Sequence, residues 1–168
     1  MTSTTSDDAI QITAKIYAPV EDVFRRFVEQ FAEWWPREYT FAGDDLLEIG
    51  IENRMGGRCF ERDRSGVFLV WGEVTTWEPP HKIVFSWWIS PQRQIEQQEE
   101  HASEVDVIVR PSENGAQLEL THRHLSRHSG DWKMMRDMMA SKHGWPYLIR
   151  TFLRESGWQY ESRHVGET

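Results

Sequence analysis

The sequence lacks most of the features that mark several protein classes. A single cysteine, Cys59, excludes a disulfide within the chain, and a reducing cytoplasmic location is expected. No apolar run approaches the roughly 18 residues that a membrane span needs, and no signal-peptide pattern stands at the start. The 19 Lys and Arg are outnumbered by 27 Asp and Glu, whereas a nucleic-acid-binding surface is normally basic. The sequence therefore predicts a cytoplasmic protein with no membrane span and no nucleic-acid partner.

The familiar catalytic motifs are also missing. There is no G-x-S-x-G elbow, no P-loop and no H-E-x-x-H pair. Cys59 has no histidine partner that the sequence identifies, so it is interpreted as a small packed residue. The sequence names no catalytic residue.

Tryptophan, in contrast, is abundant, with nine among 168 residues. The length fits one domain, and 39% hydrophobic with 27% charged residues is ordinary for a globular protein. Large rings fill cores and also line cavities, so their number alone does not separate the two roles.

Periodicity predicts a strand, then helices, then many strands, then helices. Alternation over Ile10–Ile16 predicts a strand, and Pro19 followed by acidic residues predicts one helix or two short helices that run to about Trp34. Turn residues then separate the six expected strands, which are Leu46–Ile51, Arg58–Asp63, Val67–Trp77, Lys82–Ile89, Val105–Arg110 and Gln117–His124. Two amphipathic stripes, which begin at Trp132 and Trp145, predict the final helices.

The remaining segments are expected to be loops or tails. Residues 1–8 are predicted to be a flexible tail, 9–158 a single domain, and 159–168 a C-terminal tail. Residues 92–102 have no apolar stripe and are interpreted as a long exposed loop.

Several short motifs, taken in order, resemble those of the START-like, helix-grip (SRPBCC) superfamily. They are IYAPVEDVF, EWW at 33–35, GGR at 56–58, WGEVTTWEPPHKIVFSW at 71–87, SEVDVIV at 103–109, LELTHRHL at 118–125 and HGWPYLIRTFL at 143–153. The subfamily that they resemble is related to the C-terminal domain of the heat-shock-protein ATPase activator. The ASEVDV and GGRCFERD stretches are similar to a branch that includes a calicheamicin self-resistance protein.

The resemblance implies an α+β helix-grip fold, with a curved antiparallel sheet of about six or seven strands around a long C-terminal helix. It also implies an apolar cavity between the sheet and that helix. Alternation and the family pattern together predict the residues that face the cavity. These candidate ligand-binding residues are Phe85, Trp87, Val107, Leu120, His122, His124, Trp145, Ile149 and Phe152. Trp88, on the opposite strand face from Trp87, is predicted to point outward or toward a neighbouring subunit.

His122 and His124 allow more than one interpretation. On a strand they share one side, where a neutral imidazole could orient a ligand or act as a general base, or simply be a hydrogen-bonded core residue. With His128 they also form a cluster that suggests a metal site. A convincing fourth ligand is absent from the sequence, so no metal and no other cofactor is expected.

The leading hypothesis is therefore a protein, monomeric or homodimeric, that binds a small apolar or aromatic molecule. One alternative is a chaperone-associated regulator, which the subfamily resemblance implies. Another is a cyclase- or hydrolase-like enzyme that uses His122.

Overall fold

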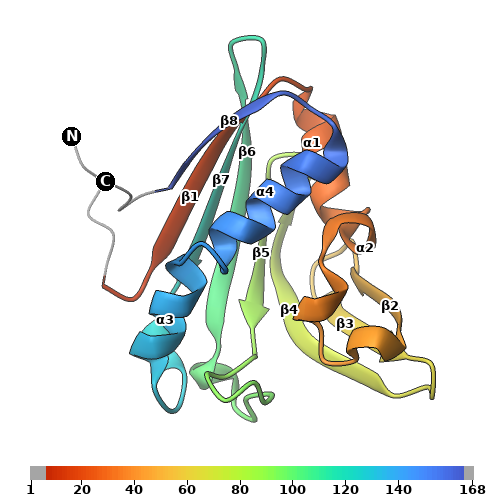
Figure 1. Ribbon diagram of the computed structural model, residues 1–168, viewed down its shortest axis with the longest axis vertical. Coiled ribbons are helices and arrows are strands. Elements are labelled where there is room, and N and C mark those ends of the chain that lie inside the picture. Colours follow the sequence, from red (N-terminus) through yellow and green to blue (C-terminus); the bar gives the residue numbers. More distant parts are fainter. Residues whose placement is uncertain (1–6, 165–168) are drawn as a thin grey trace.

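An antiparallel sheet runs through the whole molecule in the computed structural model, which describes residues 7–164 (Figure 1). Within those residues the sheet has eight strands in the order β2-β3-β4-β5-β6-β7-β1-β8. The strands are β1 (Ile10–Ile16), β2 (Leu46–Ile51), β3 (Arg58–Asp63), β4 (Phe68–Glu78), β5 (Lys82–Trp87), β6 (Ser103–Ser112), β7 (Gly115–Arg123) and β8 (Tyr160–His164). The predicted α+β helix-grip class is confirmed, with slightly more strands than expected.

The helices lie on one face of this sheet (Figure 1). The α-helices are α1 (Val20–Val28), α2 (Phe31–Trp34), α3 (Trp132–Ala140) and α4 (Trp145–Ser156). Short 3₁₀ turns are η1 (Arg37–Tyr39), η2 (Gly43–Asp45), η3 (Glu99–His101) and η4 (Leu125–Arg127). None of the helices in the described residues is long and apolar enough to cross a membrane.

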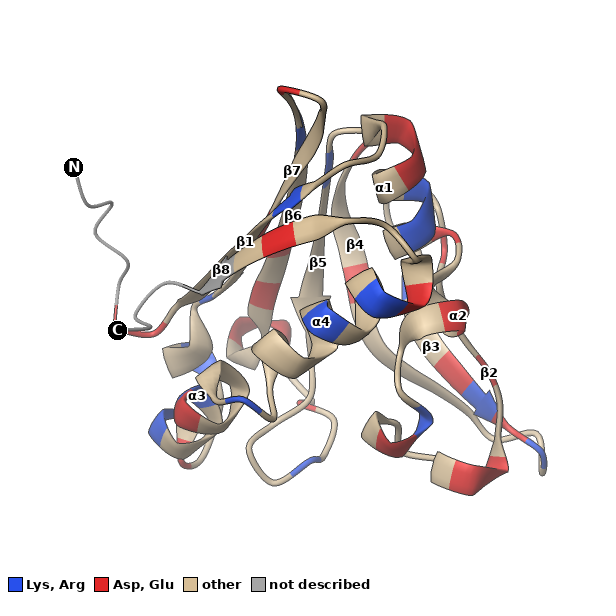
Figure 2. Cartoon of the chain, turned by 45° about the horizontal axis from the view of Figure 1, so that its top comes forward, with Lys and Arg blue, Asp and Glu red and all other residues tan. Residues whose placement is uncertain are grey.

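Helix α1 begins where the sequence predicts it. Pro19 is the N-cap with an extended backbone, and Glu21 and Asp22 occupy the first turn, where carboxylates suit the positive helix end. Arg25 and Arg26 follow in the last turn, so acidic and basic residues succeed one another along the helix (Figure 2). The opposite face of α1 is apolar and buried.

Helix α4 crosses the concave face of the sheet (Figure 1). Its residues Trp145, Ile149 and Phe152 are 0%, 1% and 0% exposed, as expected for the helix that the sheet grips. Pro146 stands in the first turn, where its missing N–H is harmless. Gly157 ends the helix in the left-handed conformation, which glycine adopts without steric penalty.

Two predicted loop or tail segments contain more structure than expected. The sequence places a C-terminal tail from residue 159, but Tyr160–His164 form β8, which pairs with β1 from Ile12 to Ile16. This edge strand is short and polar, so it lacks the apolar alternation that identifies a strand. At the other end, only residues 7 and 8 of the predicted 1–8 tail lie within the described residues.

The predicted exposed loop at 92–102 is also partly ordered by hydrogen bonds. Ile89 and Ile95 form an isolated antiparallel bridge, and Glu96 N–H donates to the Trp88 carbonyl (2.7 Å). Residues 88–96 therefore form a small hairpin that continues beyond β5, here called the 88–96 hairpin. The Glu96 carboxylate at its base is 5% exposed, so the interpretation of the segment as solvated is wrong at this position.

The close approach of β4 and β5 generates a test of the sheet. A Cβ added to Gly72 would lie 2.2 Å from the Ser86 carbonyl oxygen, whereas one added to Gly50 would meet only the Phe60 ring, at 3.5 Å. Gly72→Ala should lower the free energy of unfolding by about 2–4 kcal/mol, because two paired strands must separate. Gly50→Ala, the matched control, should change it by less than about 1 kcal/mol. Urea denaturation measures both, and equal effects would contradict the close packing.

Candidate functional site

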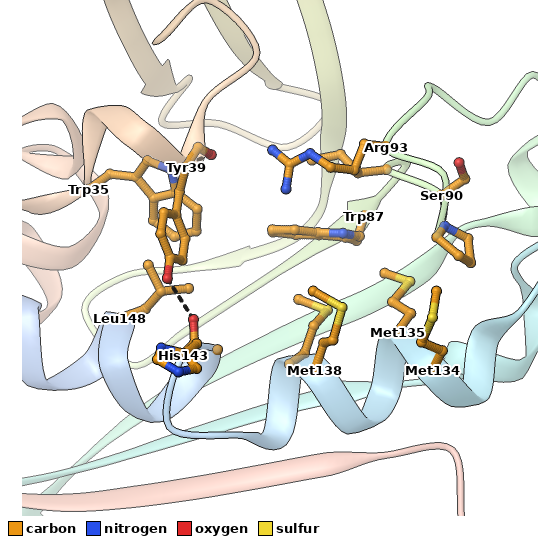
Figure 3. Close-up of a pocket in the computed structure, with 14 residues that line it drawn as sticks. Trp35, Tyr39, Trp87, Ser90, Arg93, Met134, Met135, Met138, His143 and Leu148 are labelled. Atoms are coloured by element: carbon orange, nitrogen blue, oxygen red, sulfur yellow. Dashed lines mark hydrogen bonds between the residues drawn. The ribbon is translucent and has the colours of Figure 1, made fainter.

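The pocket that we assign as the candidate site lies between α3, the start of α4, the segment after α2, and the end of β5 (Figure 3). Its volume is about 190 Å³. The lining residues are Trp35, Tyr39, Trp87, Ile89, Ser90, Pro91, Arg93, Met134, Met135, Met138, Met139, His143, Gly144 and Leu148.

Methionines from α3 form one wall of the pocket (Figure 3). Met135 is buried, whereas Met134 and Met138 are 49% and 63% exposed although both line the cavity. Methionine is unbranched and polarizable, so this wall can adapt to the outline of an apolar molecule. Asp131 caps α3 by accepting a hydrogen bond from the Met134 backbone N–H (3.1 Å), which fixes the start of the helix that carries them.

Trp87 forms the opposite, aromatic wall. It is 6% exposed, and its ring centroid lies 5.6 Å from that of Trp71, 5.9 Å from Trp145 and 6.4 Å from Trp35. Its Nε1–H has no hydrogen-bond partner in the part of the chain that the structure describes. The Trp87 indole is therefore held by packing and not by a hydrogen bond of its own. Trp88, predicted to point outward, is half-buried and does not line the pocket.

The polar groups of the pocket are few and come from separate segments. The Tyr39 hydroxyl donates to the His143 carbonyl (2.7 Å) and ties η1 to the start of α4 (Figure 3). A phenol is protonated at neutral pH, and burial raises the pKa of the Tyr39 phenol further above its ordinary value. Arg93 extends from the 88–96 hairpin and is the one formally charged lining residue at neutral pH.

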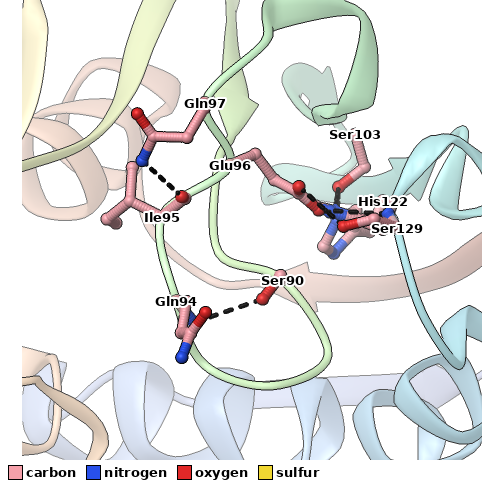
Figure 4. A network of polar contacts seen from close by, with 9 residues as sticks. Ser90, Gln94, Ile95, Glu96, Gln97, Ser103, His122 and Ser129 are labelled. Atoms are coloured by element: carbon pink, nitrogen blue, oxygen red, sulfur yellow. Dashed lines mark hydrogen bonds and ion pairs between the residues drawn. The ribbon is translucent and has the colours of Figure 1, made fainter.

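Behind the Trp87 wall, a buried series of four hydrogen bonds, here called the Glu96–Trp145 network, joins the hairpin to α4. Figure 4 shows the part of it between Glu96 and His122. Glu96 Oε2 lies 2.8 Å from His128 Nδ1, and His128 Nε2 lies 2.7 Å from Ser103 Oγ. Ser103 Oγ is also 2.7 Å from His122 Nε2, and the Trp145 indole donates to His122 Nδ1 (3.0 Å).

The direction of each hydrogen bond follows from the donors available. An indole N–H can only donate, so His122 Nδ1 accepts, and a neutral His122 carries its proton on Nε2 and donates to Ser103. The Ser103 hydroxyl then donates to His128 Nε2, and His128 Nδ1–H donates to the Glu96 carboxylate. Each of these five side chains has its hydrogen-bond partners when both histidines are neutral.

Burial keeps both histidines in that neutral state. Burial, with a smaller contribution from the neighbouring His128, lowers the pKa of His122 to about 3. Burial also lowers the pKa of His128, although the Glu96 carboxylate acts in the opposite direction. A proton added to His122 Nδ1 would face the Trp145 N–H donor, and one added to His128 Nε2 would leave the Ser103 hydroxyl hydrogen without its acceptor.

Ser103, His128 and Glu96 are the residue types of a hydrolase triad, but their setting is different. Ser103 is 0% exposed, and its oxygen already lies between two imidazoles. A nucleophilic serine must be within reach of a substrate carbonyl. The arrangement therefore fixes the position of the hairpin and of Trp145 relative to the sheet, which is a structural role.

The structure separates the residues that the sequence predicts as ligand-binding. Trp87 lines the pocket, and His122 and Trp145 lie directly behind it. The other apolar members are buried in the core between sheet and helices and do not line the pocket. They are Phe85, Val107, Leu120, Ile149 and Phe152.

His124 does not lie beside His122, contrary to the prediction. Strand β7 ends at Arg123, and His124 adopts a left-handed conformation (φ 64°) that turns the chain into η4. Its side chain is 42% exposed and lies 3.9 Å from Glu104. Among residues 7–164, no three His, Cys, Asp or Glu side chains are grouped so that they could hold a metal ion.

The positions of several site residues are not evident from the sequence. The α3 methionines were visible as an amphipathic stripe, but such a stripe is equally typical of a core helix. Glu96 and His128 lie in segments without periodicity and are 32 residues apart. Only the folded chain brings them together.

The buried histidines generate a pH prediction. His122 has a folded pKa of about 3, below the ordinary 6.5, so the unfolded chain binds more protons and stability falls as pH drops below about 6.5. Between pH 7.5 and 4.5, the wild type should lose about 2–3 kcal/mol more unfolding free energy than His122→Asn. His124→Asn, a control at an exposed left-handed position that asparagine tolerates, should keep the wild-type profile. Denaturation at several pH values measures this, and parallel profiles for all three proteins would contradict it.

Solved structures with this fold include proteins of different roles. An anthrahydroquino-gamma-pyrone synthase is 27% identical, with a TM-score of 0.60, over 90% of this chain and 99% of that one. The self-sacrificing resistance protein CalC from Micromonospora echinospora is 22% identical, with a TM-score of 0.58, over 89% and 95%. An Hsp90 activator from Plasmodium falciparum is 21% identical, with a TM-score of 0.55, over 92% and 99%.

Sequence comparison identifies the family. No protein of curated function matches the chain significantly. The family model described as "Activator of Hsp90 ATPase homolog 1-like protein" matches residues 17–155, which includes every strand from β2 to β7 and nearly all of the helices. The chain belongs to the family of Activator of Hsp90 ATPase homolog 1-like proteins, within the START-like helix-grip fold.

Proposed function

We propose that the protein binds a small, planar, mostly apolar molecule in the pocket between α3 and Trp87. The observation that carries the proposal is the composition of the pocket wall. Three tryptophan or tyrosine rings and four methionines converge there from α3, β5 and the segment after α2. Ligand sites are usually apolar hollows with a few polar groups, which is the pattern of this wall.

The size of the cavity favours a small ligand, and its aromatic wall favours a flat one. Its volume of about 190 Å³ is below the roughly 300–1,000 Å³ that is usual for drug-sized ligands, so a molecule of about two fused rings is the appropriate scale. A ring placed between Trp87 and the methionines would stack on the indole and contact polarizable sulfur.

The wall is already organised before any ligand enters. Trp87 packs against Trp71 and Trp145. Trp145 in turn is fixed by its hydrogen bond to the buried His122. A ligand that binds to this side therefore orders few protein side chains. Little conformational entropy is lost, which improves affinity. The exposed Met134 and Met138 on the other side retain freedom to adjust.

A relative supports the same class of ligand. The anthrahydroquino-gamma-pyrone synthase, 27% identical over 90% of this chain, is named for a polycyclic aromatic product. We extend from it only the chemical class, a planar aromatic molecule, because fold and moderate identity do not transfer a reaction.

The two alternatives have less support from the described residues. An enzyme that uses His122 would need this imidazole to reach a substrate, but its side chain is 0% exposed and both ring nitrogens are hydrogen-bonded within the protein. Association with a chaperone depends on the family description and not on any feature of the pocket.

Exposed methionines give a direct test of the proposed binding. Met138 is 63% exposed and lines the pocket, whereas Met55 is 64% exposed and lies in the turn between β2 and β3. With 2-naphthamide and 2-naphthoate as probes, Met138→Gln should weaken binding about three- to tenfold, because apolar contact is lost. Met55→Gln, the matched control, should leave it unchanged. Isothermal titration calorimetry measures the affinities.

Two results would refute the proposed function. One is the absence of binding by the wild type to either probe at millimolar concentration. The other is an equal effect of the two methionine substitutions, which would place the bound probe outside the pocket.

A further inference from the structure

Arg93 stands out among the residues of the pocket because it forms no ion pair with any residue that the structure describes. The Arg93 side chain is exposed, and the one hydrogen bond that the residue forms within the described part of the chain is made by its backbone N–H, to the Ser90 carbonyl. The chain has a formal net charge of −8, so acidic partners are plentiful elsewhere on the surface. The exposed Arg93 guanidinium is therefore free to pair with a molecule that enters the apolar pocket beside it.

The backbone of the 88–96 hairpin holds Arg93 in this place. The Arg93 N–H donates to the Ser90 carbonyl (2.9 Å), and Ser90 N–H donates to the Gln94 carbonyl (2.8 Å). The Ser90 hydroxyl also accepts from the Gln94 N–H (3.2 Å; Figure 4). At the base, Glu96 is bound to His128. The hairpin thus has a fixed base and turn, with the Arg93 side chain extending from the turn.

Arg93 has a left-handed backbone conformation, which arginine rarely adopts. Its φ is 60°, in the left-handed region, where glycine and asparagine are common and a long side chain is disfavoured. Glycine here would make the turn easier to form. A strained non-glycine residue at a pocket edge is a reason to consider a function for its side chain.

The guanidinium is near the pocket and not directed away from it. In Figure 3 the Arg93 side chain lies above the Trp87 ring, with Met135 and Met138 below that ring. Burial raises the pKa of the Tyr39 phenol, and the Arg93 charge opposes this, which places the charge near a second lining residue.

Glu61 is the acidic residue that shares a small neighbouring cavity with Arg93. Its two carboxylate oxygens already accept the backbone N–H groups of Phe41 (3.1 Å) and Ala42 (2.8 Å). Glu61 thus holds the segment before η2 and forms no ion pair with Arg93 among the described residues, so the charge of Arg93 remains available.

We propose that the pocket selects planar aromatic molecules that carry an anionic group, a carboxylate or an equivalent oxyanion, and that Arg93 binds this group while Trp87 contacts the ring. The inference rests on the proposed function, because it names the class of ligand for the same pocket. A guanidinium presents paired N–H donors that match the two oxygens of a carboxylate.

The test compares two probes that differ in charge and little else. 2-Naphthoate carries a carboxylate, and 2-naphthamide is its neutral counterpart of nearly the same shape. The wild type should bind 2-naphthoate about tenfold more tightly than 2-naphthamide. Raising the salt concentration to about 0.5 M should reduce this difference, because salt screens a charge at the pocket edge.

Three variants separate the role of Arg93 from general effects. Arg93→Gln should weaken 2-naphthoate about tenfold and change 2-naphthamide less than twofold. Arg93→Gly should lose the same selectivity while melting at no lower temperature than the wild type, because glycine suits the left-handed turn. Arg150→Gln, on the exposed face of α4 and outside the pocket lining, changes the net charge equally and should alter neither affinity.

Each outcome decides between the two proposals. Loss of the preference for 2-naphthoate in both Arg93 variants, but not in Arg150→Gln, supports the inference. Equal binding of the two probes by the wild type, with sensitivity to Met138→Gln, overturns the role of Arg93 and leaves the apolar pocket standing. Failure of both probes to bind overturns both proposals.

Discussion

The packing of α4 against the concave face of the sheet is the interaction on which the rest of the structure depends. Trp145, Ile149 and Phe152 are completely or almost completely buried there, and each such side chain contributes roughly 1.5–3 kcal/mol by leaving water. The same contact sets the position of the pocket. Gly144 and Leu148 line it from the start of α4, and Trp145 supports the Trp87 wall from behind.

The buried series of hydrogen bonds that links Glu96 to Trp145 makes the position of α4 specific. Apolar packing alone would allow the helix to slide or rotate by small amounts, since rings tolerate several relative orientations. Four hydrogen bonds, which all form when both histidines are neutral, restrict the position of Trp145 and of the hairpin base. These hydrogen bonds thereby connect the 88–96 hairpin to the core.

The pocket combines this rigid side with an adaptable one. Trp87 belongs to a cluster of packed rings, whereas Met134 and Met138 belong to a helix face that remains partly open to solvent. With this division, the methionine wall can change by substitution on α3 without disturbing the core. Arg93 adds the one charge on the cavity wall, and it comes from the hairpin, which is the least regular element around the pocket.

The sequence by itself determined the element types and most of their bounds, because alternation and helical period are local properties of the chain. It identified β1, α1 and α4, the burial of Trp145, Ile149 and Phe152, and the strand position of His122. Tertiary structure alone decided the rest. Edge strand β8 has too little apolar pattern to be visible, and His124 left its strand through a left-handed turn. Ser103 and His128, 25 residues apart, meet only because the sheet and η4 bring their buried side chains to one place.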